Sequence, residues 1–178
     1  MLLFFIFFIL GGIKMASTSY LVRAIYKEHT DTGETTDFSG TYHLLVKAKS
    51  MPSPVSAPNT VESTTFEDDA QTFEMGIKTS ASKDITGNLE KEYLDGIDEL
   101  QGKKIDIMQL YGTDGVGGVA KYAYVGQAVA TPNDVGGSDE ILEMTVTVIP
   151  NTAAKKVTDE YTVTDNGDGT FTVTSVGA

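Results

Sequence analysis

The chain of 178 residues contains no cysteine and no tryptophan, and it has only two histidines, His29 and His43. The absence of cysteine excludes a disulfide framework, a thiolate zinc site and a cysteine nucleophile. Neither histidine has a second histidine or a close acidic residue at the spacing of a metal-ligand pair. We therefore expect no metal site, and we expect both histidines to be surface or hydrogen-bonded side chains.

Basic residues are also scarce. The 13 lysines and arginines stand against 25 aspartates and glutamates, which gives a formal net charge of −12. A field of this sign repels phosphate backbones. The charge balance therefore argues against a sequence-specific nucleic-acid binder.

Motifs that carry catalytic chemistry are missing as well. The glycine-rich residues 112–118 lack the Lys-Ser/Thr pair of a phosphate-binding loop. Adjacent carboxylates occur at Asp68 and Asp69 and at Asp98 and Glu99, but neighbouring side chains of a strand or a helix point in different directions. No serine, histidine and acid are spaced as a nucleophile elbow requires. The sequence predicts neither an enzyme nor a cofactor.

No apolar run reaches the length of about 20 residues that a membrane-spanning helix needs. The most hydrophobic run, MLLFFIFFIL, ends after ten residues at a Gly-Gly pair. Three interpretations of residues 1–14 remain open. They are a hydrophobic extension, a signal or anchor segment that lacks a preceding basic residue, and a misassigned start. The third arises because GGIKM can be encoded by a ribosome-binding site and a start codon, and it makes Met15 the physiological start.

Alternating apolar residues predict that most of the chain is β-strand. In residues 73–79 the alternation places Phe73, Met75 and Ile77 on one face, which we expect to cover a core. Residues 141–149 alternate in the same way, with one face formed by Leu142, Met144, Val146 and Val148. Further strands are expected at residues 20–26, 42–49, 61–66, 104–111 and 121–130.

One amphipathic helix is expected between these strands. Apolar residues at spacings of four, four and three line one stripe of it, namely Leu89, Tyr93, Ile97 and Leu100. We expect the helix to begin near Thr86 or Gly87 and to stop at Gly102, because a glycine suits the position after a helix end. Gly96 inside the helix costs about 1 kcal/mol relative to alanine, so packing must hold the helix together.

Two segments between and after the strands have a distinct composition. Residues 50–60 contain three prolines, so they cannot form a central strand. A loop of this length is usually disordered or committed to a contact. Near the C-terminus, residues 161–164 and 171–175 flank DNGDG, which predicts a β-hairpin. This turn lacks the later glutamate of an EF-hand, so we expect no calcium loop.

The same order of pieces occurs in a known family. A proline-bearing loop is followed by PNTVESTTFEDDAQTFEMGIKTS, a helix ending in YLDGIDEL and a late strand MTVTVIP. This arrangement, from about residue 16 to 157, resembles the major tail tube proteins of long-tailed bacteriophages, especially those that infect Gram-positive hosts. The resemblance implies a mainly β fold, a sandwich of two antiparallel sheets flanked by one α-helix, over residues 15–157. Residues 158–178 would form a C-terminal hairpin that is part of the domain or an appendage.

The resemblance also implies a function. Such proteins are structural virion proteins, made in the bacterial cytoplasm, that assemble into hexameric rings and stack into a tube. Phage DNA passes through the lumen without sequence-specific binding, and the other partners are the tape measure, terminator and distal tail proteins, with no membrane involved. An acidic chain suits such a conduit. By position, the subunit interface would include Met51, Pro52, Pro54, Val55, Pro58 and Asn59 in an inter-ring loop, and Ser17 and Ser19 in an N-terminal arm.

A secreted or cell-surface β-sandwich adhesion module is the alternative. The apolar N-terminus and the segment YTVTDNGDGTFTVT favour it, because similar segments are common in bacterial surface repeats. This alternative requires processing near Ala16 and export. Cell fractionation distinguishes the two, because an adhesin would be found on the envelope and a tail protein in virions or lysates.

Overall fold

The computed structural model describes residues 18–30, 36–78 and 80–177. The expectations for residues 1–14, for Met15 and for Ser17 lie outside these ranges. The described part is mainly β, with one helix, α1 (Lys91–Asp98). Its strands are β1 (Arg23–Glu28), β2 (Gly40–Leu44), β3 (Ala48–Ser50), β4 (Pro58–Glu62), β5 (Phe73–Lys78), β6 (Lys83–Asn88), β7 (Ile105–Tyr111), β8 (Ala120–Pro132), β9 (Glu143–Pro150), β10 (Lys155–Lys156), β11 (Tyr161–Asp165) and β12 (Thr170–Ser175).

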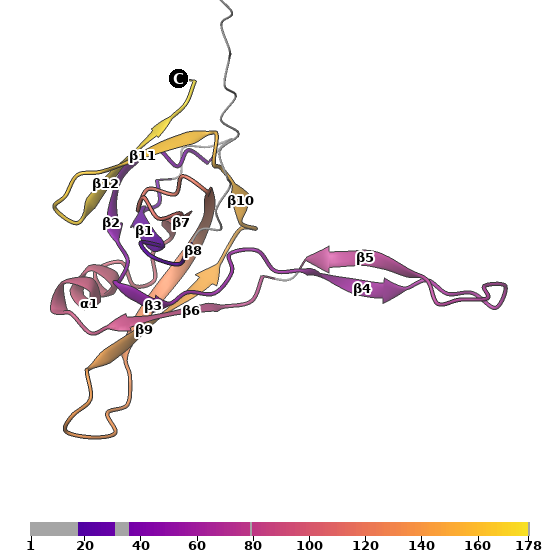
Figure 1. Ribbon diagram of the computed structural model, residues 1–178, viewed down its shortest axis with the longest axis horizontal. Coiled ribbons are helices and arrows are strands. Elements are labelled where there is room, and N and C mark those ends of the chain that lie inside the picture. The colour runs from indigo at the N-terminus through magenta and orange to yellow at the C-terminus, as the bar shows by residue number, and fades with distance from the viewer. Residues whose placement is uncertain (1–17, 31–35, 79, 178) are drawn as a thin grey trace, which may run out of the picture.

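Ten of the strands form one antiparallel sheet, in the order β11-β12-β2-β1-β7-β8-β9-β6-β3, with β10 paired to β8. Figure 1 shows that this sheet curls on itself, so that β6 and β9 form a layer below β1 and β7. The remaining strands, β4 and β5, form a separate two-stranded ribbon that extends away from this body. The predicted fold class, mainly β with antiparallel layers and one flanking helix, is confirmed. The two layers are parts of one hydrogen-bonded sheet.

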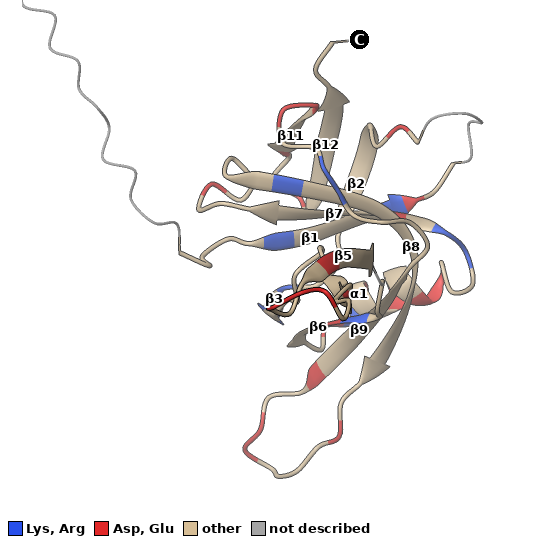
Figure 2. Cartoon of the chain, turned by 90° about the vertical axis from the view of Figure 1, so that its right-hand side faces the viewer, with Lys and Arg blue, Asp and Glu red and all other residues tan. Residues whose placement is uncertain are grey.

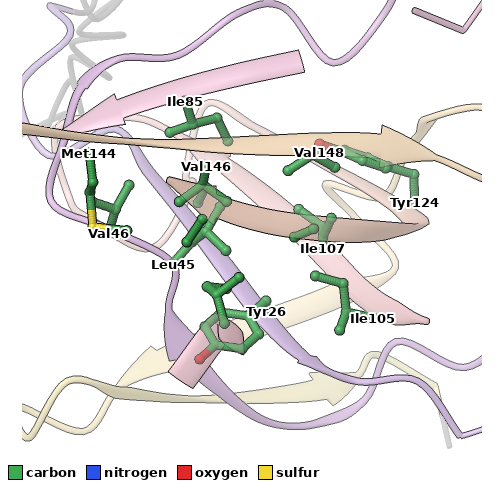
Figure 3. Close-up of a cluster of buried hydrophobic side chains, with 14 residues drawn as sticks. Tyr26, Leu45, Val46, Ile85, Ile105, Ile107, Tyr124, Met144, Val146 and Val148 are labelled. Carbon is green, nitrogen blue, oxygen red and sulfur yellow. The ribbon is translucent and has the colours of Figure 1, made fainter. Parts of the chain in front are cut away.

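The curled sheet encloses an inner core. Figure 3 shows side chains from both layers meeting there, among them Ile107 of β7, Ile85 of β6 and Val146 of β9. The alternation predicted for residues 141–149 is confirmed for Met144, Val146 and Val148, which are fully buried. Leu142 is half exposed instead, because β9 begins one residue after it.

A second core lies on the outer face of β1, β7 and β8, under the C-terminal hairpin. Strand β12 pairs with β2, and the hairpin buries Tyr161, Val163, Phe171 and Val173. Arg23 Nη1 lies 2.5 Å from Asp165 Oδ2, and this contact holds the pKa of Asp165 below its ordinary value. Strand β7 is consequently buried on both faces.

Helix α1 packs its apolar stripe on the inner core. Ile97 is fully buried, and Leu89, Tyr93 and Leu100 are partly buried against the core, which confirms the stripe. The expected start near Thr86 or Gly87 is wrong, because those residues belong to β6 and pair with β9. Gly102 has the expected positive φ of 83°, but the helix ends four residues before it, at Asp98. Within the described ranges, no helix has the length and apolar character needed to cross a membrane.

The strand expected over residues 42–49 is broken into two. Strand β2 ends at Leu44, β3 begins at Ala48, and a corner of three residues joins them. Leu45 and Val46 at this corner are buried in the inner core. The corner carries the chain from β2, beside β1, to β3, at the opposite edge of the sheet.

A buried charged cluster ties β1 to β7. The side chain of Asp106 is 1% exposed, and its carboxylate lies 3.1 Å from Lys27 Nζ and 2.6 Å from His29 Nδ1. Lys27 Nζ also donates a hydrogen bond of 2.8 Å to the carbonyl of Ser39, so the cluster holds the segment that leads into β2. His29 is thus a hydrogen-bonded histidine, as expected, although its acidic partner is distant in the sequence.

We expect Asp106→Ala to lower the free energy of unfolding by about 3 kcal/mol, because it removes the buried carboxylate and leaves the partly buried Lys27 without its counter-charge. The matched control is Asp84→Ala, whose exposed carboxylate accepts a hydrogen bond from Thr147 Oγ1. This control should cost about 1 kcal/mol or less. Urea denaturation of both variants measures the difference, and equal losses would contradict the role given to the cluster.

Gly96 allows a close contact between α1 and β1. A Cβ atom at this position would lie 2.5 Å from the hydroxyl of Tyr26, which is nearly buried. We therefore expect Gly96→Ala to destabilise the protein, despite the higher helix propensity of alanine. In a Tyr26→Phe background the obstructing hydroxyl is gone, and the same substitution should stabilise by up to about 1 kcal/mol. A thermal unfolding cycle measures this change of sign, and the same sign in both backgrounds would refute the explanation.

Candidate subunit interface

The ribbon of β4 and β5 projects from the body (Figure 1), and most of its residues are exposed. The two strands pair antiparallel, with Thr60 opposite Met75 and Glu62 opposite Phe73. The expected strand at residues 61–66 is therefore shifted, and it begins at Pro58 and ends at Glu62. Proline is tolerated here because a two-stranded ribbon has only edge strands.

One face of the ribbon carries an apolar stripe that has no cover in the single chain. Phe73, Met75 and Ile77 alternate along β5 on this face, as the sequence predicts. Met75 is 77% exposed and Ile77 is 83% exposed, so the expectation that this face covers a core is wrong. On the opposite face, Gly76 leaves no room for a side chain, because a Cβ atom there would lie 2.9 Å from Val61 Cγ2.

The turn at the end of the ribbon is acidic and internally ordered. Asp68 Oδ2 accepts hydrogen bonds from the backbone N–H of Thr65 at 2.7 Å and from its hydroxyl at 3.0 Å. These bonds hold the pKa of Asp68 below its ordinary value. Phe66, between the two residues, is fully exposed. The turn thus presents one aromatic side chain among carboxylates.

The proline-bearing segment leads from β3 into the ribbon. Met51 packs against the inner core and Pro54 is buried, whereas Val55 is exposed. The expected loop of residues 50–60 is shorter than predicted, because its first residue belongs to β3. Pro58 and Asn59, at its end, already lie in β4.

A groove runs along the body beside this segment. It is lined by Met51, Pro54, Val55, Tyr111, Val119 and Tyr122. An adjoining hollow shares Met51, Tyr111 and Val119 and includes Ser19, so the structure brings one residue of the expected arm close to the expected loop. Val119 and Val55 are both exposed in the single chain. The groove and the ribbon stripe are two apolar surfaces on neighbouring parts of the molecule.

The ribbon stripe and the groove carry apolar side chains. Among residues 18–30, 36–78 and 80–177, no group of three or more His, Asp or Glu side chains is placed to hold a metal ion. The acidic turn of the C-terminal hairpin uses its carboxylates internally, because Asp168 Oδ1 accepts hydrogen bonds from the backbone and hydroxyl of Thr170. The expected turn is thereby confirmed. Ribbon and groove offer exposed apolar side chains and open strand edges.

Most of the interface residues expected from the sequence lie on the segment before the ribbon or in the arm, and only Pro58 and Asn59 lie on the ribbon itself. The apolar stripe of β5 was not among them. Phe73, Met75 and Ile77 were expected to cover a core because they alternate with other residues. A strand face that is buried and a strand face that is left uncovered show the same alternation in the sequence. The only signal that could have separated them is the acidic run at residues 67–69, which marks an exposed turn. Val119 follows a glycine-rich turn and gave no signal.

The likeness of this chain to known proteins lies in its fold. Neither protein-family models nor curated proteins match the sequence. A chain in the six-fold symmetrised cryo-EM structure of the anti-feeding prophage baseplate superposes with a TM-score of 0.52 at 9% sequence identity. The match covers 81% of this chain and 97% of that chain. The two chains share a fold.

We expect the stripe to be accessible to oxidant in the dilute single chain. Met75 should be converted to its sulfoxide by hydrogen peroxide much faster than Met108 and Met144, which are fully buried. Peptide mass spectrometry of briefly treated protein measures the three rates, and the two buried methionines are the internal control. Equal rates would show that the ribbon stripe is covered.

Proposed function

We propose that this chain is a structural protein of a phage tail-type assembly, and more specifically that it forms hexameric rings that stack into a tube conducting DNA. The observation that carries the proposal is the ribbon, an ordered element whose apolar stripe and strand edges are uncovered in the single chain. The shared fold with a chain of a six-fold symmetrised prophage baseplate supports the class of assembly.

The ribbon is better explained by a partner than by the single chain. An isolated two-stranded hairpin is marginally stable in water, and three or more strands or a packing surface are needed to hold it. Exposed strand edges with apolar side chains invite pairing with another chain. Identical copies placed around a ring offer each other the same surfaces, so the ribbon of one copy can lie against the body of the next.

We further propose that the segment before the ribbon takes part in the same contact. Met51, Pro54 and Val55 line the groove beside Val119. Pro52 stiffens the segment between them, and Pro58 and Asn59 begin the ribbon. Ser19 lies in the adjoining hollow, where an N-terminal arm would run. The interface would then extend continuously from the body onto the ribbon.

The charge of the chain fits a conduit for DNA. The net charge is −12, and Figure 2 shows acidic residues on the ribbon strand β5 and along the loop between β8 and β9, which carries no blue segment. A wall of the same sign as the phosphates keeps the duplex from adhering. The other proposed partners are the tail proteins at the ends and in the interior of such a tube.

The adhesion alternative rests on the apolar N-terminus, which lies outside the described residues, and on the C-terminal hairpin, which resembles segments of surface repeats. In this chain the hairpin pairs with β2 and buries four large side chains against the same body. It is therefore an integral part of the sheet and not a free repeat. No feature of the described residues favours the alternative over the assembly.

We expect purified protein to form rings or tubes that are visible by negative-stain electron microscopy at high concentration. The double variant Met75→Glu/Ile77→Glu should abolish them while leaving the circular dichroism of the body unchanged, because it places two charges on the apolar stripe. Val176→Glu, which changes an exposed valine near the C-terminus, is the matched control and should still assemble.

In the assemblies Met75 should also become protected from peroxide. A strictly monomeric protein at high concentration, or tubes that form equally well with the double variant, would contradict the proposal.

A further inference from the structure

Lys83 lies where the two legs of the ribbon join the body. We call the segment between β3 and β4 the incoming leg, because the chain enters the ribbon through it, and the segment between β5 and β6 the outgoing leg. The outgoing leg follows the end of β5 at Lys78, and β6 begins at Lys83. The incoming leg passes through Ser53 before β4 begins at Pro58. Lys83 Nζ donates a hydrogen bond of 2.7 Å to the carbonyl oxygen of Ser53. One side chain therefore links both legs at the base of the ribbon.

The side chain of Lys83 is in an unusual place for a cation. Lys83 is 7% exposed and lies on the inner face of β6, the same face as Ile85 and opposite Val148. None of the ion pairs found in the described ranges involves it. Burial without a carboxylate lowers the pKa of this lysine. A buried, unpaired ammonium costs stability, so its presence needs a reason other than stability.

The backbone of the incoming leg is restricted around Ser53, the residue that Lys83 contacts. The Ser53 hydroxyl donates to the carbonyl of Val55 at 2.9 Å, which closes a tight local turn. Pro52 and Pro54 flank Ser53 and restrict its backbone. Pro54 is buried against the body. A hydrogen bond at Ser53 consequently fixes the direction of the whole segment rather than of one peptide.

We propose that Lys83 sets the direction in which the ribbon leaves the body. It is a positioning residue, because it acts through Ser53 and not through the apolar stripe. β5 has 6 residues and spans about 20 Å at about 3.3 Å per residue, so a small rotation at the base moves the stripe by several ångströms. The effect on a single chain stands on its own, whereas its consequence for assembly rests on the proposed function.

The absence of cysteine makes a direct measurement possible. Spin labels on Gln71→Cys, in the turn of the ribbon, and Thr162→Cys, on the exposed face of β11, report the distance between ribbon and body in the otherwise unchanged chain. In the protein with Lys83, double electron–electron resonance should give a narrow distance distribution. Lys83→Met should broaden it clearly, while the midpoint of thermal unfolding stays equal or rises, because an apolar side chain replaces a buried charge.

Two further variants complete the design. Lys83→Gln is neutral and its terminal nitrogen is one bond closer to Cα, so it should broaden the distribution as Lys83→Met does, and it serves if the methionine variant does not fold. Lys156→Met removes an exposed lysine of β10 and should leave the distribution narrow. A narrow distribution in both Lys83 variants would overturn the proposal.

Assembly gives a separate readout. If the proposed function holds, Lys83→Met should raise the protein concentration needed for tubes several-fold, with the apolar stripe intact. A broadened distribution in a protein that never forms tubes would keep the role of Lys83 and contradict the proposed function. An unchanged distribution in a protein that does form tubes would contradict the role of Lys83 and keep the proposed function.

Discussion

The closure of the curled sheet is the constraint on which the rest of this structure depends. The corner after β2 carries the chain across the inner core to β3, at the far edge of the sheet. Gly87 on β6 makes this possible, because a Cβ atom there would lie 2.5 Å from the carbonyl of Lys47. Closure buries Leu45 and Val46 and brings the base of the ribbon next to β6.

After closure, the two faces of the sheet pack against different parts of the molecule. The inner face holds the main core, and part of the outer face is covered by the C-terminal hairpin. Strand β7, between the two cores, is almost continuously buried, which is why it can hold a charged cluster around Asp106 away from water. The body is therefore well packed without any partner. The ribbon and the groove at its base carry much of the uncovered apolar surface, and Val135, Ile141 and Leu142 between β8 and β9 carry another part.

A rigid body with a directed ribbon is a suitable unit for repeated assembly. Association loses less conformational entropy when the contact surfaces are already ordered. In the proposed assembly, the prolines before β4 and the hydrogen bond from Lys83 to Ser53 would both order the ribbon before it contacts another chain. In the proposed tube, the acidity of the chain would suit a polyanion that passes along a wall of the same sign.

The sequence by itself determined the β-rich class, the amphipathic stripe of α1 and the C-terminal hairpin, because each follows from local periodicity and turn chemistry. Only the tertiary structure decided which apolar faces are buried. Phe73 and Met75 have the same alternation as Met144 and Val146, yet the first pair is exposed and the second buried. The contacts of Asp106 and Lys83 could not be predicted from the sequence either. Their partners, Lys27, His29 and Ser53, are distant in the chain and come into contact with them only after the sheet has closed.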